Sequence, residues 1–223
     1  RRFYLKLRRV AIRCGFEESK LMKSLYVYRK NGKIVSLMAV HVDDILWATV
    51  DGVEDPVMKM LKEFEIKETK SGNFRFCGRE FVQHADFGIN VTCKDNIERI
   101  KPVNLAGESR TGDSAATEGQ ISQLRSVLGS TGWIARQCRP EYCYEYSRLQ
   151  SVVTKASVDD LVSANRMVEG LQSTSSIGLY FAPEVFDWND MMLITITDAS
   201  WANDSYVAGD RTFERRSQYG RIH

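Results

Sequence analysis

The chain has 223 residues, of which 43% are hydrophobic and 27% charged, a composition that excludes a disordered or collagen-like protein. Its 31 Lys and Arg nearly balance its 29 Asp and Glu, so the net charge of +2 does not by itself indicate a nucleic-acid partner. The longest apolar stretch, residues 34–50, is interrupted by His41, Asp43 and Asp44. A membrane-spanning helix needs about eighteen uninterrupted apolar residues, and this stretch has fewer. We therefore expect no membrane span and no membrane partner.

The sequence begins without Met and without an apolar leader, so we expect it to be an internal piece of a longer protein. Its five cysteines contain no CxxC pair, and the three histidines lie far in sequence from any two neighbouring cysteines. A zinc site is therefore not indicated. An odd number of cysteines without a signal sequence predicts a reducing, intracellular location, with most thiols acting as small core side chains.

Positive charge is concentrated at the start of the chain. Residues 1–33 contain eleven Lys or Arg and only two acidic residues, which gives a local charge of +9. Arginine suits phosphate contacts because its planar guanidinium donates two parallel hydrogen bonds. This segment is therefore a candidate for binding a nucleic-acid backbone, although a solvated basic helix face has the same composition. The candidate cations are Arg1, Arg2, Lys6, Arg8 and Arg9.

The first predicted element is a basic amphipathic helix over residues 3–16, which Gly15 ends. Its apolar residues are Leu5, Leu7, Val10, Ile12 and Phe16. A strand over 25–28, an Asn31-Gly32 turn and a strand over 34–42 then predict a β-hairpin. A further β-type run over 45–50 predicts a second hairpin, with Asp43 and Asp44 at its turn.

After the hairpins, Asp55 and Pro56 predict a helix start, because Asp caps free N–H groups and Pro suits the first helical position. Phe74, Phe76 and Phe81 around Gly78 predict a strand or tight hairpin. Residues 104–119 are polar and rich in small side chains, which predicts a loop and a domain boundary.

Three helices are predicted in the next region. They begin at a capping box formed by Thr117 and Gln120, at Pro140, and at a cap formed by Ser157 and Asp160. Strands over 177–181 and 191–197 follow, and the second leads directly to Asp198. The mixture of hairpins and helices predicts an α+β protein.

Asp43 and Asp44 are the most distinctive chemical feature, because strand interiors disfavour Asp. At a hairpin turn their oxygens can share a small volume, and oxygen ligands are those that Mg²⁺ prefers. Two such ions about 4 Å apart activate a 3′-hydroxyl and stabilise a leaving phosphate. The alternative is that both residues only shape the turn, as Asp often does.

The residues around this pair resemble the (Y/F)-x-D-D-(I/M/L) box of reverse transcriptases, most closely the YVDD form of the Ty1/copia retrotransposons, with His41 in place of the usual Tyr. Further segments resemble other family motifs and occur in the family's order. They are residues 64–66 with 72–80 (FLGIEI segment), 124–141 (YRSLVGSLMYLA-TRPD), 146–150 (AVSRLS), 178–180 (GLxY), 197–202 (SDADWA) and 216–220 (RKSTSG).

This resemblance implies an α+β fold in three parts: a partial polymerase palm over residues 1–103, a helical thumb and connection over 104–176, and the start of a ribonuclease H-like domain over 177–223. It also implies RNA-directed DNA synthesis by two-metal nucleotidyl transfer, with Mg²⁺ or Mn²⁺ as cofactor. The implied partners are an RNA template, a DNA primer or hybrid, dNTPs and the remainder of the Pol polyprotein, in the cytoplasm or nucleus.

The resemblance also assigns roles to particular residues. Asp43 and Asp44 would hold the polymerase metals, and Asp198 would be the first metal-binding carboxylate of the ribonuclease H site. Candidates for gripping the primer end are Phe76, Cys77, Gly78 and Arg79.

The family's third polymerase carboxylate would lie upstream of residue 1, and its later ribonuclease H carboxylates beyond residue 223. We therefore expect the isolated chain to bind Mg²⁺ poorly and to lack polymerase activity. The alternative function is that of a non-catalytic relic of such an element, or of a basic nucleic-acid-binding fragment.

Overall fold

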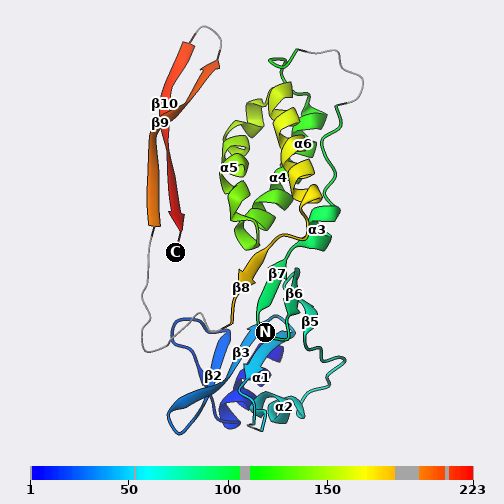
Figure 1. The fold of residues 1–223 in the computed structure, drawn as a ribbon, viewed down its shortest axis with the longest axis vertical. Coiled ribbons are helices and arrows are strands. Elements are labelled where there is room, and N and C mark those ends of the chain that lie inside the picture. The colour runs from blue at the N-terminus through cyan, green and yellow to red at the C-terminus, as the bar shows by residue number, and fades with distance from the viewer. Residues whose placement is uncertain (1, 53, 106–110, 184–195, 209–210, 223) are drawn as a thin grey trace. The chain divides into compact units, whose positions relative to one another are not determined.

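The protein is described by a computed structural model that covers residues 2–52, 54–105, 111–183, 196–208 and 211–222. The chain divides into two compact units, Arg1–Pro183 and Glu184–His223 (Figure 1). The first unit contains two separate hydrophobic cores. Its helices and antiparallel sheets confirm the α+β class. None of the described helices is long and apolar enough to cross a bilayer.

The first core lies between a four-stranded antiparallel sheet and two helices. The strands are β1 (Phe16–Glu18), β2 (Leu25–Lys30), β3 (Lys33–His41) and β4 (Asp44–Thr49), in that order across the sheet. The helices are α1 (Arg2–Arg13) and α2 (Pro56–Leu61). Alternate residues Ser36, Met38 and Val40 of β3 are buried, as the period of two in a strand requires.

Helix α1 confirms the predicted helix but ends at Arg13, so that Phe16 belongs to β1, and it corrects the predicted apolar face. Leu7 and Val10 are buried as expected, whereas Leu5 and Ile12 are 50% and 46% exposed. Successive helical residues are separated by about 100°, so Leu5 and Ile12 lie about 200° from Leu7 and Val10 respectively. Two residues that are two positions apart point to nearly opposite sides of a helix. The five predicted apolar residues therefore cannot all lie on one face.

Both predicted hairpins of this sheet are present. Strands β2 and β3 join through Asn31 and Gly32, whose φ angles of 51° and 76° are those that a tight hairpin turn requires. Helix α2 begins at Asp55, whose side chain accepts hydrogen bonds from the backbone N–H of Val57 and Met58. The cap predicted from the Asp-Pro pair is therefore confirmed.

The second core lies between another four-stranded sheet and a group of helices. The strands are β5 (Asn73–Phe76), β6 (Arg79–Gln83), β7 (Ile89–Thr92) and β8 (Leu179–Phe181), in that order. The longer helices are α3 (Lys94–Glu98), α4 (Glu118–Gln137), α5 (Cys143–Val152) and α6 (Val158–Ser173), with single 3₁₀ turns at Pro140–Tyr142 and Val153–Lys155. Figure 1 shows the chain returning from α6 to place β8 beside β7.

The sequence signals for helix starts in this region are confirmed. Capping boxes at Thr117–Gln120 and Ser157–Asp160 begin α4 and α6, and Pro140 begins the 3₁₀ turn that leads into α5. Helix α6 continues to Ser173.

The second core contains residues from both sides of position 103, where the predicted palm ends. Val91, Ile97 and Val103 pack with Leu124 of α4 and Leu161 of α6. Strand β8 likewise pairs with β7, although its residues follow position 176. The division that the structure makes lies after residue 183, and the boundaries inferred from the family resemblance stay predictions.

The second unit contains strands β9 (Ile196–Ala208) and β10 (Arg211–Ile222), which pair in antiparallel fashion with two register shifts. The sequence predicts a strand over residues 191–197. Positions 191–195 lie outside the described residues, and positions 196 and 197 begin β9. Asp198 lies on β9 opposite Gly220 of β10.

Candidate metal centre and nucleic-acid interface

Asp43 and Asp44 lie at the turn between β3 and β4, as predicted. His41 pairs with Asp44 across the ladder, so the hairpin closes through only Val42 and Asp43. Val42 has a φ of 57° in the left-handed region, which is strained for a β-branched residue. Such strain persists where the surrounding structure enforces it, here the well-paired strands on either side.

Both carboxylates are exposed to solvent, and no described residue forms a hydrogen bond or ion pair with either of them. Their oxygens are suitable ligands for Mg²⁺. Within the described part of the chain, however, no third His, Cys, Asp or Glu joins them in a cluster that could hold a metal ion. The donor chemistry thus fits, while the number of donors is short of a complete site. The metal role of the pair stays a prediction.

The β3–β4 hairpin packs against the first core. Met38 and Val40 of β3 are buried against α1 and α2, and Trp47 of β4 packs against the same core. The indole N–H of Trp47 donates a hydrogen bond of 2.9 Å to Asp55, the cap of α2. The strands that carry the two carboxylates are therefore fixed to the helices behind them by packing and by a side-chain hydrogen bond.

The four primer-grip candidates form the turn of the β5–β6 hairpin. Phe76 and Arg79 pair across the ladder, and Cys77 and Gly78 have φ angles of 49° and 76°. The carbonyl of Gly78 accepts a hydrogen bond of 2.7 Å from the Asn96 side chain on α3. A Cβ atom on Gly78 would lie 3.3 Å from the Trp133 ring of α4. The turn is thus anchored to two helices rather than free in solvent.

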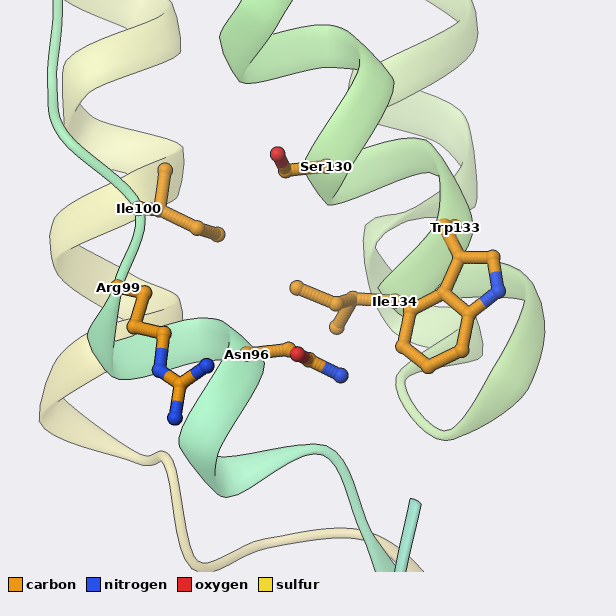
Figure 2. Close-up of a pocket in the computed structure, with 6 residues that line it drawn as sticks. All are labelled: Asn96, Arg99, Ile100, Ser130, Trp133 and Ile134. Atoms are coloured by element: carbon orange, nitrogen blue, oxygen red, sulfur yellow. The ribbon is translucent and has the colours of Figure 1, made fainter. Parts of the chain in front are cut away.

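Beside this turn, α3 and α4 enclose an open pocket of about 430 Å³. Figure 2 shows Arg99 and Trp133 on opposite sides of it, with Asn96 and Ile134 between them. Ile100 and Ser130 complete the lining. The pocket offers a cation, an aromatic face and polar groups that can hydrogen-bond, a combination suited to a base and a phosphate.

No motif in the sequence predicts this pocket. Trp133 is half-buried against the second core and also lines the pocket. Asn96 and Arg99 carry no motif, and they meet Trp133 only through packing of segments more than thirty residues apart. No local signal in the sequence marks them.

The basic segment is partly neutralised within the fold. Arg8 forms an ion pair of 2.8 Å with Glu18, whose pKa is lowered because Arg8 and Tyr4 donate hydrogen bonds to it. The amino group of Lys6 donates to the backbone carbonyl of Glu63 at 3.3 Å. Among the described residues, Arg2 and Arg9 form no ion pair, which leaves them available to an external anion. Arg1 lies outside the described residues.

Asp198 is on β9 of the second unit, whereas the paired carboxylates belong to the first. Its role in a ribonuclease H site therefore stays a prediction that rests on the motif around it.

Comparison with known proteins gives two similar curated sequences from Arabidopsis thaliana. They are the retrovirus-related Pol polyproteins from transposons RE1 and RE2, each 24% identical to this chain over 217 and 218 residues respectively. The matches cover 92% of this chain and 14% of each relative, so the chain spans about a seventh of their length. No protein-family profile and no solved structure matches. The comparisons support a segment derived from a retrotransposon Pol polyprotein.

Proposed function

We propose that this chain is part of a retrotransposon RNA-directed DNA polymerase, containing the hairpin that binds the catalytic metal and the helical region that follows it. The observation that carries the proposal is the exposed Asp43–Asp44 pair at the closed end of a β-hairpin that packs against the first core. Similarity to Pol polyproteins along 92% of the chain supports the same conclusion.

In this role Asp43 and Asp44 would hold Mg²⁺, which supplies activation of the primer 3′-hydroxyl and stabilisation of the leaving pyrophosphate. Since the pair contributes only two carboxylates, a third would come from another segment of the polymerase. The strained turn at Val42 presents both carboxylates toward solvent, where a nucleotide and primer can approach.

The β5–β6 turn would lie near the primer terminus in the same role. Its anchoring by Asn96 and Trp133 supports this assignment, because a positioning element must itself be rigid. In the same role Arg99 and Trp133 of the neighbouring pocket would contact the same strand of nucleic acid. Asp198 would begin the site that cleaves the RNA of the hybrid.

Primer extension by the longer polymerase that contains this segment tests the proposal. Asp43→Asn and Asp44→Asn remove a negative charge at constant size, and each should lower templated synthesis by at least about a hundredfold, the scale on which loss of one preorganised electrostatic group acts. Asp51→Asn, at the turn that follows β4, is the matched control and should retain activity. Retained synthesis in both active-site variants would refute the proposal.

Residues 1–223 alone should show no templated synthesis, because two carboxylates do not complete a two-metal site. Primer extension by this chain in isolation would overturn that expectation.

The alternative, a relic whose remaining property is nucleic-acid association, is favoured by the two unpaired arginines of α1. It predicts that residues 1–223 bind an RNA–DNA hybrid with affinity that falls steeply with salt. Replacing Arg2 and Arg9 together by Ala should reduce the slope of log affinity against log salt by about 2, roughly one for each lost phosphate contact. Binding that is absent or insensitive to salt would exclude this basic-segment interface.

A further inference from the structure

Two buried cysteines of the second core lie in direct contact and have no part in the proposed metal chemistry. Cys93 follows β7 and immediately precedes α3, and Cys138 ends α4. Their side chains are 0% and 2% exposed, and the two sulfur atoms are 3.0 Å apart. Forty-five residues separate them in sequence. The fold therefore brings two free thiols together at the junction between the β5–β8 sheet and the helices.

The sulfur contact gives each thiol of the pair a reaction partner at 3.0 Å. An S–S bond is about 2.05 Å long, so bond formation requires the sulfurs to approach by only about 1 Å. Cys143, the next cysteine along the chain, is half-buried on α5. Burial raises the pKa of its thiol, which makes it a poorer nucleophile at neutral pH.

We propose that Cys93 and Cys138 form a reversible disulfide that ties the start of α3 to the end of α4, and so makes the stability of this unit sensitive to oxidants. Hydrogen peroxide is the simplest oxidant of the required class. In the reduced state the two thiols remain packed in the core as they are in the structure.

The reaction balances in two steps. The Cys138 thiolate attacks one oxygen of peroxide, breaking the O–O bond and giving a sulfenic acid and hydroxide. The Cys93 sulfur, as a thiolate, then attacks the Cys138 sulfur, forming the S–S bond and expelling a second hydroxide. Both hydroxides take up the protons released by the two thiols, so two thiols and one peroxide yield one disulfide and two waters.

The hydrogen bond between the two thiols and their opposite pKa shifts indicate the order of attack. The S–H of Cys93 donates its hydrogen bond to the sulfur of Cys138. This contact is the main reason that the pKa of Cys138 lies below its usual value, while burial acts in the opposite direction. The same contact and burial raise the pKa of Cys93. Cys138 is therefore the thiol that ionises first and attacks the oxidant.

Access to the pair requires local opening, since neither sulfur reaches solvent in the closed state. The end of α4 is the natural point of opening, because helix termini have fewer backbone hydrogen bonds than helix interiors. Oxidation is thus expected to be slow in the folded protein and faster under conditions that loosen this terminus.

The cross-link should stabilise the unit by restricting its unfolded chain. A disulfide that closes a loop of about 45 residues is expected to raise the midpoint of thermal unfolding by roughly 10 °C for a protein of this size. Reduction should return the midpoint to its original value.

The test exposes residues 1–223 to hydrogen peroxide, blocks the remaining thiols by alkylation, and maps the non-reduced peptides by mass spectrometry. The expected product links the peptides that contain Cys93 and Cys138, raises the unfolding midpoint, and is reversed by dithiothreitol. Cys93→Ala and Cys138→Ala should each lose both effects. Cys143→Ala, the matched control, should keep them.

The single-site variants could lose both effects simply by failing to fold. A triple variant in which Cys14, Cys77 and Cys143 are replaced by Ser therefore provides a second test. It retains only the buried pair and should still form the cross-link and gain stability. The proposal is overturned if peroxide leaves the pair unlinked in this variant, oxidises the thiols only to isolated acids, or links them without raising the midpoint.

Discussion

A tight contact between α4 and α5 in the second core makes a sharp stability prediction. Gly132 of α4 is buried, and a Cβ atom added there would lie 2.2 Å from a ring carbon of Tyr146 on α5. Gly129 lies three residues earlier on the same helix, is exposed, and has nothing within 4 Å of an added Cβ atom. The two glycines share a helix and differ in what an extra methyl group would meet.

The magnitudes follow from this difference. Replacing Gly by Ala in a helix interior stabilises by about 0.5–1 kcal/mol, since Ala loses less backbone freedom on folding. Gly129→Ala should show this full gain. At Gly132 the ring must move by more than 1 Å, and overpacking of this kind costs about 1–3 kcal/mol or more. Gly132→Ala should therefore lie about 1–3 kcal/mol below Gly129→Ala in its free energy of unfolding.

Urea unfolding of residues 1–223, followed by circular dichroism at a helix wavelength, measures both variants against the parent. Tyr146→Ala supplies a further control, because it removes the ring that an added methyl would strike. In that background Gly132→Ala should become neutral or stabilising. Equal stability of the Gly129 and Gly132 variants would refute the packing of α4 against α5 that the structure shows.

Three further predictions concern single side chains. Val42→Asn should raise the free energy of unfolding by about 1 kcal/mol, because Asn tolerates a positive φ and the Val42 side chain is 74% exposed. Arg139→Met should lower it by about 2–3 kcal/mol, because Arg139 is 3% exposed and donates hydrogen bonds of 3.0 and 2.8 Å to Thr174. Glu18→Gln should weaken the acid sensitivity of unfolding, because hydrogen bonds from Arg8 and Tyr4 lower the pKa of Glu18 in the folded state. The stability that Glu18 contributes is therefore present above its unfolded-state pKa and is lost as the pH falls through its folded-state pKa.

Each of these changes has a matched control, measured by the same chemical unfolding. Val50→Asn is made at an exposed residue that lacks a positive φ, and it should give no gain in stability. Arg136→Met removes an exposed arginine of α4 and should cost less than about 1 kcal/mol. Glu17→Gln, beside Glu18 and 3.6 Å from Arg29 at the surface, removes the same charge without touching the Arg8 and Tyr4 hydrogen bonds of Glu18. If a control changes the free energy of unfolding, or its pH dependence, as much as the paired variant does, the structural role given to that side chain is wrong.

Local signals in the sequence were sufficient for most element boundaries. The Asn31-Gly32 turn, the Asp55 cap and the two capping boxes depend on residues within four positions of one another, and the structure contains all of them. The two carboxylates at a hairpin turn were found in the same way, because apolar strand residues flank them on both sides.

Features that depend on distant segments could not be predicted in this way. Strand β8 pairs with β7 across about ninety residues, and no local pattern specifies that partner. The pocket between α3 and α4 and the Cys93–Cys138 contact likewise arise only when separate elements pack. The error at Leu5 and Ile12 has a different cause, since both were counted as apolar without their angular position on the helix.

Metal binding at the β3–β4 turn is the sharpest test of the role proposed for Asp43 and Asp44. Titration of residues 1–223 with Mn²⁺, followed by paramagnetic broadening of backbone amide signals in NMR spectra, detects even a weak site formed by two carboxylates. We expect broadening to begin at residues 42–45, at millimolar metal. Asp43→Asn together with Asp44→Asn should remove it, whereas Asp51→Asn should not. Broadening that begins elsewhere, or that persists without both carboxylates, would contradict the proposed role.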